Sequence, residues 1–432
     1  MTPVLPRVKP AAPETQLVRA VGVAGLAASI VNVTIGGGIF RLPALVAATL
    51  GAAAPLAFLV CAAVMGLIVV CFAMAGKRVD RTGGPYAYAE AAFGPYAGFL
   101  AGVLVWLLGT TAVAAVSTVL ADSVGALVPA AAGQSGRAAF LLLTFGALAA
   151  VNIAGVKHGT RLNAVATVAK LLPLVVLIAA GGFAVSPANL AWTEPVRAGT
   201  VARASMLLIF AFCGIETALV PSGEIRDVRR TVPRALALAM TVVTGIYLAL
   251  QLVAQGILGA GLAAEKAPLA AAAARALGPW GGTLILAGAA VSMLGYTGGM
   301  TLAVPRALYA FGRDGYLPQG LARIHPRFHT PVVAIAAQSG LVCLLAIGSG
   351  FERLAVVANL STLILYAGCC LAAWRLGRAE GGVVSTAAPA VACLAIAWLL
   401  TSITWPEWRA VLLVLGIASL LYVFATIRRK GA

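Results

Sequence analysis

The sequence predicts an all-α polytopic membrane protein with about twelve transmembrane helices. Of its 432 residues, 61% are hydrophobic and 10% are charged, and the mean hydropathy is +1.00. Soluble domains average about 45–50% apolar and about 25% charged residues, so this composition excludes a soluble globular protein. Apolar runs of roughly 20 residues, the length that crosses a hydrocarbon core, recur along the whole chain.

Charged segments and segments rich in Pro and Gly separate these runs and set the expected helix boundaries. The expected spans are 18–48, 54–76, 86–120, 137–156, 162–184, 202–221, 233–258, 281–311, 331–348, 353–375, 385–403 and 408–427. No long polar region interrupts them, so we expect one transmembrane domain over 17–428, with short tails at 1–16 and 429–432. The first tail lacks the features of a secretory signal, and no cleaved leader is expected.

The basic residues predict the orientation of these spans. Dense groups of Lys and Arg lie at 77–81, 157–161, 226–234, 306–327 and 428–430, all on one predicted side of the membrane. Because cytoplasmic loops carry the excess of Lys and Arg, both termini are expected in the cytoplasm, and the span count is expected to be even. The net charge of +17 thus belongs to loops beside a bilayer, and no nucleic-acid partner is expected. Scarce Lys beside abundant Ala, Gly and Arg favours the plasma membrane of a bacterium.

The first span contains three successive glycines, within Thr34–Phe40. Glycine weakens a helix, so the backbone can unwind there and expose amide and carbonyl groups. Each unpaired backbone group in hydrocarbon costs several kcal/mol, so a break at membrane depth persists only where it lines a protein cavity. This stretch therefore predicts a binding site inside the membrane.

The sixth span contains a second candidate break, within Phe210–Thr217, where a glycine lies beside a carboxylate. Five spans precede it, so it runs opposite to the first span. Paired breaks of this kind are typical of transporters built from inverted repeats. The expected repeats are 17–184 and 200–376, and 385–428 supplies two added helices.

Several motifs, in the right order and on the right side of the membrane, resemble the amino acid-polyamine-organocation (APC) superfamily of amino acid permeases. They are Ile35–Phe40 with Leu42-Pro43, Gly83–Tyr86 with Phe93-Gly94, Phe210–Glu216, the loop Gly223–Ala235, and Pro305–Pro331. The resemblance covers nearly the whole chain. It implies a LeuT-like 5+5 inverted repeat with broken helices 1 and 6, plus two extra helices.

The two breaks present complementary charges. A half-helix that starts after Gly38 directs its N-terminal amides into the cavity and suits a carboxylate, whereas a half-helix that ends near Phe212 presents carbonyls that suit an ammonium. Together they predict an α-amino acid as substrate. The expected binding residues are Ile35, Gly36, Gly37, Gly38 and Ile39 for the carboxylate, and Phe210, Ala211, Cys213 and Gly214 around the amine. The resemblance implies that Phe210 is an aromatic lid; ordinary helix packing is the alternative.

Two ionisable residues lie within the predicted spans near these breaks. Lys170 follows Arg161 by nine residues, which places it about 13 Å into the fifth span. Burial disfavours a charged amine, and the resemblance places such a lysine beside the first break, so Lys170 is the expected proton carrier. A permanent charge held by carbonyls is the alternative. Glu216 is expected to accept amides freed by the second break, or to relay protons.

These features predict a secondary active transporter that works by alternating access. The predicted activity is proton-coupled uptake of neutral amino acids. An exchanger of amino acids, amines or polyamines is the alternative, and a channel or an intramembrane enzyme is remote. His158, His325 and His329 all fall in loops, and the seven cysteines lie in apolar segments without metal-ligand spacing. We therefore expect no enzymatic activity, cofactor or metal, and the expected partners are an amino acid, protons and the lipid bilayer.

Overall fold

The protein is helical throughout the described part of the computed structural model, which covers residues 22–76, 78, 85–154, 160–192, 195–214, 228–377 and 383–430. The α-helices are α1 (Val23–Thr34), α2 (Leu42–Leu50), α3 (Ala54–Gly76), α4 (Pro85–Phe93), α5 (Pro95–Leu127), α6 (Gln134–Ala154), α7 (Thr160–Gly181), α8 (Ala198–Phe212), α9 (Val228–Leu258), α10 (Pro268–Leu277), α11 (Pro279–Ala303), α12 (Pro305–Arg313), α13 (Val332–Gly348), α14 (Phe351–Gly377), α15 (Val383–Leu400) and α16 (Trp405–Lys430). Short 3-10 helices connect several of them, including η1 (Gly37–Phe40), η3 (Pro129–Ala131) and η8 (Gly259–Ala264). No β-strand occurs in these ranges.

Many of these helices are suited to a bilayer. Within the described ranges, seven helical segments are long and apolar enough to cross a membrane, and further apolar helices are shorter. The seven segments are Leu42–Gly76, Pro95–Leu127, Gln134–Ala154, Arg230–Ala264, Pro279–Arg313, Phe351–Gly377 and Trp405–Arg428. An all-helical polytopic membrane protein is therefore confirmed, whereas the count of about twelve spans and the inverted repeat remain predictions.

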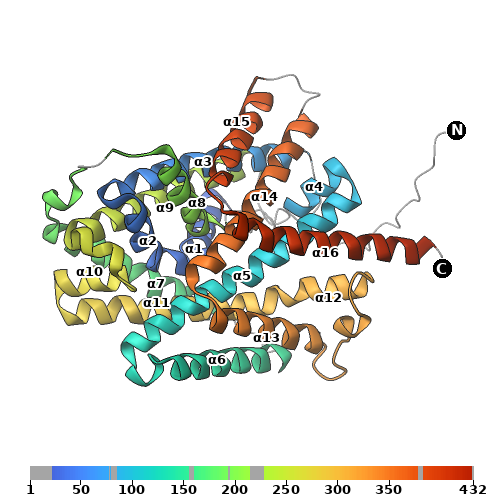
Figure 1. Ribbon diagram of the computed structural model, residues 1–432, viewed down its shortest axis with the longest axis horizontal. Helices are drawn as coiled ribbons and strands as arrows, with labels where there is room; N and C mark the ends of the chain where they lie inside the picture. The colour runs from blue at the N-terminus through green and yellow to red at the C-terminus, as the bar shows by residue number, and fades with distance from the viewer. Residues whose placement is uncertain are drawn as a thin grey trace.

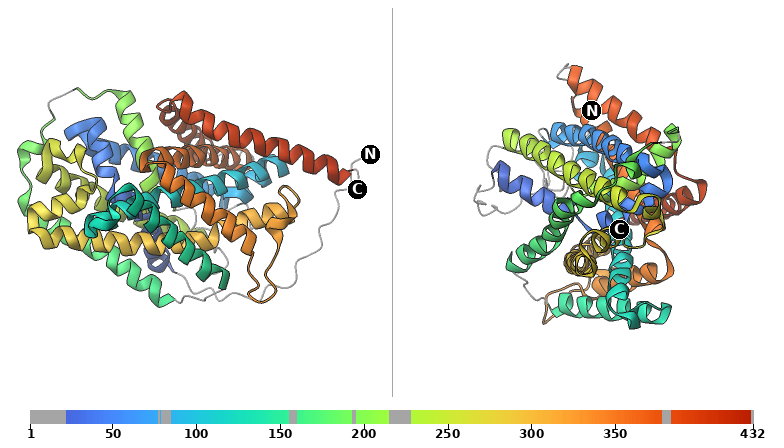
Figure 2. Two further views of the ribbon diagram at one scale, coloured as in Figure 1. Left: turned by 60° about the horizontal axis from the view of Figure 1, so that its bottom comes forward. Right: turned by 90° about the vertical axis from the view of Figure 1, so that its left-hand side faces the viewer.

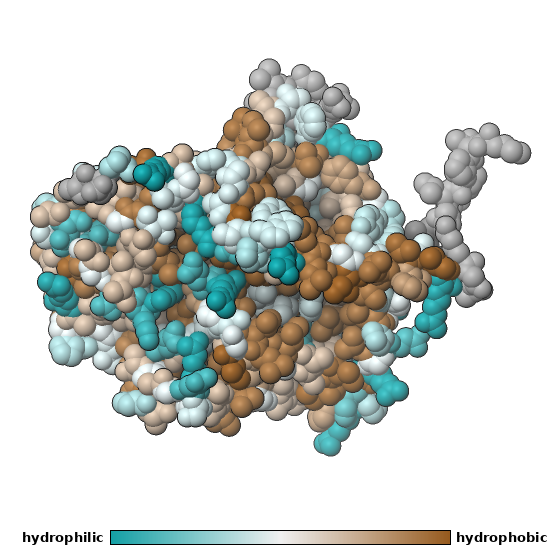
Figure 3. Space-filling model, in the orientation of Figure 1, coloured by the Kyte–Doolittle hydropathy of each residue, from teal (hydrophilic) through white to brown (hydrophobic). Residues whose placement is uncertain are grey.

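The outer surface of the bundle is rich in apolar side chains. Leu413, Leu420 and Phe424 on α16 are exposed, and Figure 3 shows apolar residues over the α16 side of the visible face. A soluble protein rarely leaves so large an apolar surface uncovered, so this face is suited to contact with lipid chains.

The first predicted span is broken at the glycines, as expected. α1 ends at Thr34, η1 covers Gly37–Phe40, and α2 starts at Leu42. The predicted span 54–76 coincides with α3.

The prediction of one continuous span over 86–120 was wrong. Gly94 has a φ of +90° and separates α4 from α5, which starts at Pro95. A positive φ stops a right-handed helix, and the proline ring then favours a new first turn. The structure also contains α10, which was absent from the predicted spans and packs against α11. α10 is too short to be recognised as a span from its hydropathy.

The arrangement of the helices brings the break into the interior. α5 packs against α14 and α11, α1 packs against α9, and α8 packs against α2 and α3 (Figures 1 and 2). η1 contacts α5, α8 and α11. The glycine-rich stretch is thus surrounded by helices that lie far from it in the sequence.

Candidate functional site

The backbone leaves the helical conformation immediately after α1. Ile35 has φ −73° and ψ 85°, and Gly36 is extended with φ −109° and ψ −161°. The Gly36 N–H donates to the Thr34 carbonyl at 2.8 Å, which closes a tight turn. A new helical N-terminus then begins at Gly37. The first amides of such a terminus have no intrahelical partner, and they carry the positive end of the helix dipole.

Glycine is required at two positions of η1 because neighbouring side chains approach closely. A Cβ at Gly37 would lie 2.9 Å from Val116 Cγ1, and a Cβ at Gly38 would lie 2.8 Å from Phe210 Cδ1. The Phe210 ring therefore lies against η1. It also makes an edge-to-face contact with Phe351, with ring centroids 5.3 Å apart. The predicted lid residue is thus in contact with the predicted carboxylate-binding stretch, and Ile35 and Ile39 are fully buried beside it.

α8 ends next to α1. Cys213 leaves the helix with ψ 155°, and Gly214 has a φ of +106°. A Cβ at Gly214 would lie 2.9 Å from Val33 Cγ1, so the end of α8 touches the last turn of α1. The Cys213 thiol lies 3.8 Å from the Thr362 hydroxyl of α14. The predicted Glu216 lies outside the described residues.

Tyr247 of α9, which no pattern in the sequence singled out, joins the ends of α1 and α8. Its hydroxyl lies 2.9 Å from the Thr34 carbonyl and 2.9 Å from the Ala211 carbonyl, and its side chain is fully buried. A single tyrosine in an apolar span is a signal for such a role, because a buried hydroxyl needs a partner.

Lys170 of α7 reaches the same region. Its ammonium donates to the Asn32 carbonyl of α1, two residues before the last residue of that helix. On α14, the buried Asn359 side chain donates to the Met206 carbonyl of α8 at 2.8 Å. Side-chain donors from three neighbouring helices, α7, α9 and α14, therefore bind carbonyls of α1 and α8.

Polar atoms without partners remain near the break. Thr34 Oγ1, Ser117 Oγ and Thr297 Oγ1 are buried and have no hydrogen-bond partner within the described part of the chain. Ser117 follows Val116, which contacts Gly37, and Thr297 lies one turn from Met293, which also contacts Gly37. Buried hydroxyls are normally paired, so these atoms are candidates for contact with water or a small polar ligand.

The arrangement is suited to binding rather than to catalysis. It offers helix-terminal amides, carbonyls and one ammonium within an apolar surround. Over the described ranges, no group of three or more His, Cys, Asp or Glu residues could hold a metal ion. The amides at the start of η1 and the carbonyls at the end of α8 thus lie close to one another.

Comparisons with known proteins agree with this geometry. A family model described as "Amino acid permease" matches residues 21–427. An uncharacterized transporter of Mycobacterium tuberculosis is 33% identical over 352 residues, which cover 80% of this chain and 78% of that protein. The serine/threonine exchanger SteT of Bacillus subtilis is 27% identical over 364 residues, which cover 82% of each chain. These relatives are transporters and not enzymes, and the resemblance to the amino acid-polyamine-organocation superfamily is confirmed. The protein is therefore a membrane transporter that belongs to the amino acid permease family.

Proposed function

We propose that the protein is a secondary active transporter that moves neutral amino acids across the membrane by alternating access. The observation that carries this proposal is the meeting of the ends of α1 and α8, at Thr34 and Phe212, beside one buried tyrosine. The η1 amides bind the substrate carboxylate, and the carbonyls at the end of α8 bind its ammonium. Phe210 closes over the bound amino acid.

The proposed coupling ion is a proton, carried by Lys170. The Lys170 ammonium contacts the Asn32 carbonyl, so the protonation state of this side chain affects how firmly α1 is held against α7. When the amine is protonated, it donates to α1; loss of the proton weakens that contact and frees α1 to move. Proton release and the inward movement of α1 are linked in this way.

Exchange of one amino acid for another is the second candidate function. The observation that favours it is the similarity to the serine/threonine exchanger SteT of Bacillus subtilis. In an exchanger, Lys170 would hold α1 as a fixed charge and would not release its proton in each cycle.

Uptake into proteoliposomes tests both functions. A panel of radiolabelled amino acids, including serine and threonine, is supplied with and without an inside-alkaline pH gradient, and with and without amino acid inside. Accumulation of an amino acid in empty vesicles only when the pH gradient is present supports proton symport. Uptake only into preloaded vesicles, independent of the gradient, supports exchange, and absence of uptake under every condition contradicts the proposal.

Lys170→Ala separates the two roles of the lysine. For a proton carrier, we expect the variant to lose accumulation driven by the pH gradient while it retains exchange into preloaded vesicles. Arg275→Ala, which removes an exposed basic residue in the last turn of α10, controls for the loss of one charge in this assay. Full gradient-driven accumulation by Lys170→Ala would exclude the carrier role.

A further inference from the structure

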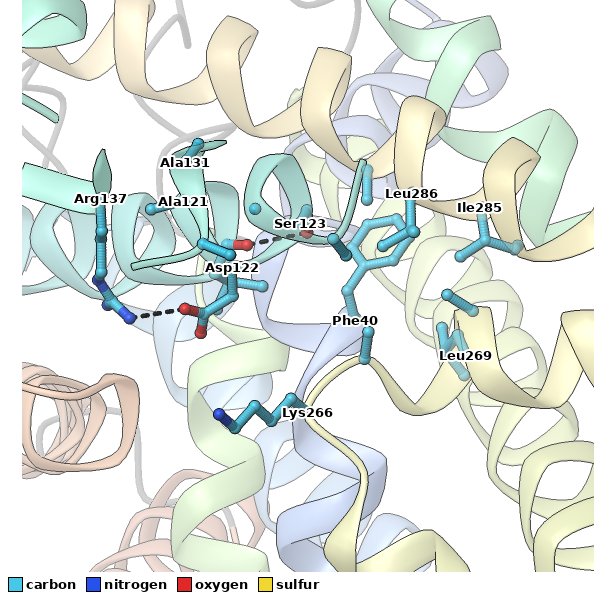
Figure 4. A pocket seen from close by; sticks show the side chains of 17 residues that line it. Phe40, Ala121, Asp122, Ser123, Ala131, Arg137, Lys266, Leu269, Ile285 and Leu286 are labelled. Carbon is cyan, nitrogen blue, oxygen red and sulfur yellow. Dashed lines mark hydrogen bonds and ion pairs between the residues drawn. The ribbon is translucent and has the colours of Figure 1, made fainter. Parts of the chain in front are cut away.

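A charged cavity and an apolar groove lie near opposite ends of α5. The cavity, of about 260 Å³, is beside Phe40 of η1, and its lining includes Asp122, Arg137 and Lys266 (Figure 4). The groove, of about 240 Å³, lies between α5, α12 and α16, and every residue that lines it is aliphatic or aromatic. Water is stable beside charged groups but not in an apolar recess, so the groove is suited to a hydrocarbon ligand.

The groove is continuous with the lipid-facing surface of the protein. Its three helices belong to Pro95–Leu127, Pro279–Arg313 and Trp405–Arg428, which are long and apolar enough to cross a membrane. Ile417 of α16 lines the groove and is half exposed. Leu413 and Leu420, its neighbours on the same helix, are exposed on the surface suited to lipid. The acyl chains of the bilayer therefore have direct access to the groove.

The length of the groove matches one leaflet. Its wall on α5 runs from Phe99 to Trp106, and its wall on α16 runs from Val414 to Leu421. At a rise of 1.5 Å per residue, each wall is about 10 Å long. One leaflet of a hydrocarbon core about 30 Å thick is about 15 Å deep. The groove can therefore hold much of one acyl chain, but it does not reach across the bilayer.

A cluster of tyrosines lies at one end of the groove. The Phe99 ring centroid lies 4.4 Å from that of Tyr316 and 5.3 Å from that of Tyr422. The Tyr96 hydroxyl is hydrogen-bonded to the Ser419 hydroxyl at 2.8 Å, and the Tyr96 ring contacts Tyr422. Tyrosine combines an apolar ring with a polar hydroxyl and is enriched where a membrane meets water. This end of the groove is thus suited to the interface, and the other end to the interior of the leaflet.

The indole of Trp106 forms part of the wall at the far end. Its Nε1 donates to the Gln338 Oε1 of α13 at 2.9 Å, and Gln338 Nε2 donates to the Thr110 hydroxyl at 2.9 Å. Gln338 is almost completely buried. The one polar atom of the indole is therefore satisfied on the side of α13, and a chain in the groove meets no unpaired donor from this residue.

We propose that the groove is a binding site for one acyl chain of a membrane phospholipid. The chain extends from the tyrosine cluster towards Trp106 and packs against α5, α12 and α16. The lipid comes from the leaflet at the end of the molecule where Arg306, Arg313 and Arg428 are exposed, which the distribution of basic residues predicts to be cytoplasmic. This site is separate from η1, and the inference goes beyond the proposed transport function.

Photolabelling with a phospholipid that carries a diazirine in the middle of one acyl chain tests the proposal. The full-length protein is reconstituted into vesicles that contain this lipid. One sample is irradiated in the vesicles, and a second is irradiated after extraction into detergent and washing. Mass spectrometry of the digested protein locates the label. Leu142 and Leu143 on α6 are exposed and lie outside the groove, so they report contact with bulk lipid.

We expect label at Val103 and Ala418, which line the groove but are buried, because only a chain inside the groove reaches them. This label should persist after washing, whereas label at Leu142 and Leu143 should be largely lost. Label confined to exposed residues, or groove label that washes away together with the α6 label, would overturn the proposal. An unlabelled groove in a protein that elutes as a dimer would assign the groove to a second copy of the chain instead.

A matched pair of variants on α16 tests the groove itself. Ala418→Phe places a ring in the groove, whereas Leu420→Phe places the same ring on the exposed side. Loss of contact with about two methylene groups weakens binding about tenfold, so Ala418→Phe should reduce the retained label at Val103 by that factor. Leu420→Phe should be labelled like the wild type.

A variant on α5 repeats the test from the opposite wall. Val103→Phe fills the groove from α5, and its effect is measured at Ala418. Thermal unfolding in detergent shows which of the two groove variants is folded, and the folded one decides the result. Wild-type labelling of the groove in a folded Ala418→Phe or Val103→Phe protein would exclude the groove as the lipid site.

Discussion

Gly38 is the residue at which the proposed site has least room, since the ring of Phe210 occupies the space that a Cβ would need. Gly38→Ala should displace Phe210 or η1, and such overpacking costs about 1–3 kcal/mol. We therefore expect KM for amino acid uptake to rise about tenfold. Gly66→Ala on α3 is the matched control, because a Cβ there meets no atom within 4 Å.

The measurement is the concentration dependence of uptake into proteoliposomes, with the thermal stability of each purified variant recorded beside it. A wild-type KM for Gly38→Ala would exclude contact between Phe210 and the substrate as a determinant of affinity. Replacing Gly by Ala favours the helical conformation by about 1 kcal/mol at either position, so equal defects in both variants would point to this change in helix propensity rather than to the close contact.

Tyr247 offers a test of the link between α1 and α8. Its hydroxyl has one proton to donate, so the Thr34 and Ala211 carbonyls compete for it. Tyr247→Phe leaves both carbonyls without this donor in a buried place, which costs about 1–3 kcal/mol. We expect a lower thermal unfolding temperature and slower maximal uptake.

The control for this substitution is Tyr422→Phe on α16. Tyr422 stacks on Tyr316, with ring centroids 5.8 Å apart, and this ring contact does not need the hydroxyl. If Tyr247→Phe matches the wild type in both measurements, the hydrogen bonds of Tyr247 contribute nothing to the coupling of α1 and α8.

At the scale of elements, α8 is anchored at its start and ends beside α1. Arg203 near its start forms two hydrogen bonds with Glu407 of α16, of 2.9 and 3.0 Å, and lies 3.5 Å from Glu352 of α14. Glu407 also accepts from the Thr404 N–H at 2.7 Å, which caps the first turn of α16. One arginine thus joins the starts of three helices, while the other end of α8 faces the break.

A double-mutant cycle at this anchor gives a quantitative prediction. Because the Arg203–Glu407 pair is bidentate and about three-quarters buried, we expect a coupling free energy of about 1–2 kcal/mol between Arg203→Ala and Glu407→Ala. The exposed Arg313–Asp314 pair is the comparison, with an expected coupling below about 0.5 kcal/mol. Thermal unfolding of the purified proteins provides the measurement. Equal coupling free energies in the two pairs would contradict a stabilising role for the Arg203–Glu407 pair.

At the scale of the whole molecule, the distribution of basic residues predicts that both termini lie in the cytoplasm. A fluorescent protein fused after Ala432 should fluoresce, and an alkaline phosphatase fused there should be inactive, because that enzyme folds only outside the cytoplasm. A phosphatase inserted after Gly133, between α5 and α6, should be active. The opposite pattern would reverse the orientation, and a fluorescent C-terminus with an inactive phosphatase at Gly133 would contradict the predicted span count.

The same orientation places the cavity at Lys266 on the outer side of the membrane. Arg137, at the start of α6, and Lys266, in the loop before α10, belong to segments with few basic residues, whereas Arg306 and Arg313 belong to the dense group predicted to be cytoplasmic. The fusion experiment tests this placement of the cavity independently of any transport assay.

The sequence by itself determined the properties that depend on one segment at a time. Hydropathy identified the apolar helices, because each segment's own transfer free energy decides whether it can lie in a bilayer. The three glycines at Gly36–Gly38 predicted the break after Thr34, because glycine weakens a helix wherever it lies. The interruption at Gly94 was missed because an averaged hydropathy does not reveal a single residue with positive φ.

The tertiary structure decided which of these segments meet. Tyr247 contacts carbonyls 213 and 36 residues away in the sequence, and Lys170 contacts one 138 residues away. Lys266 was only an isolated basic residue in a loop until folding placed it in a cavity with Phe40. These contacts depend on how whole helices pack together, and the local preferences of a sequence contain no direct record of that packing.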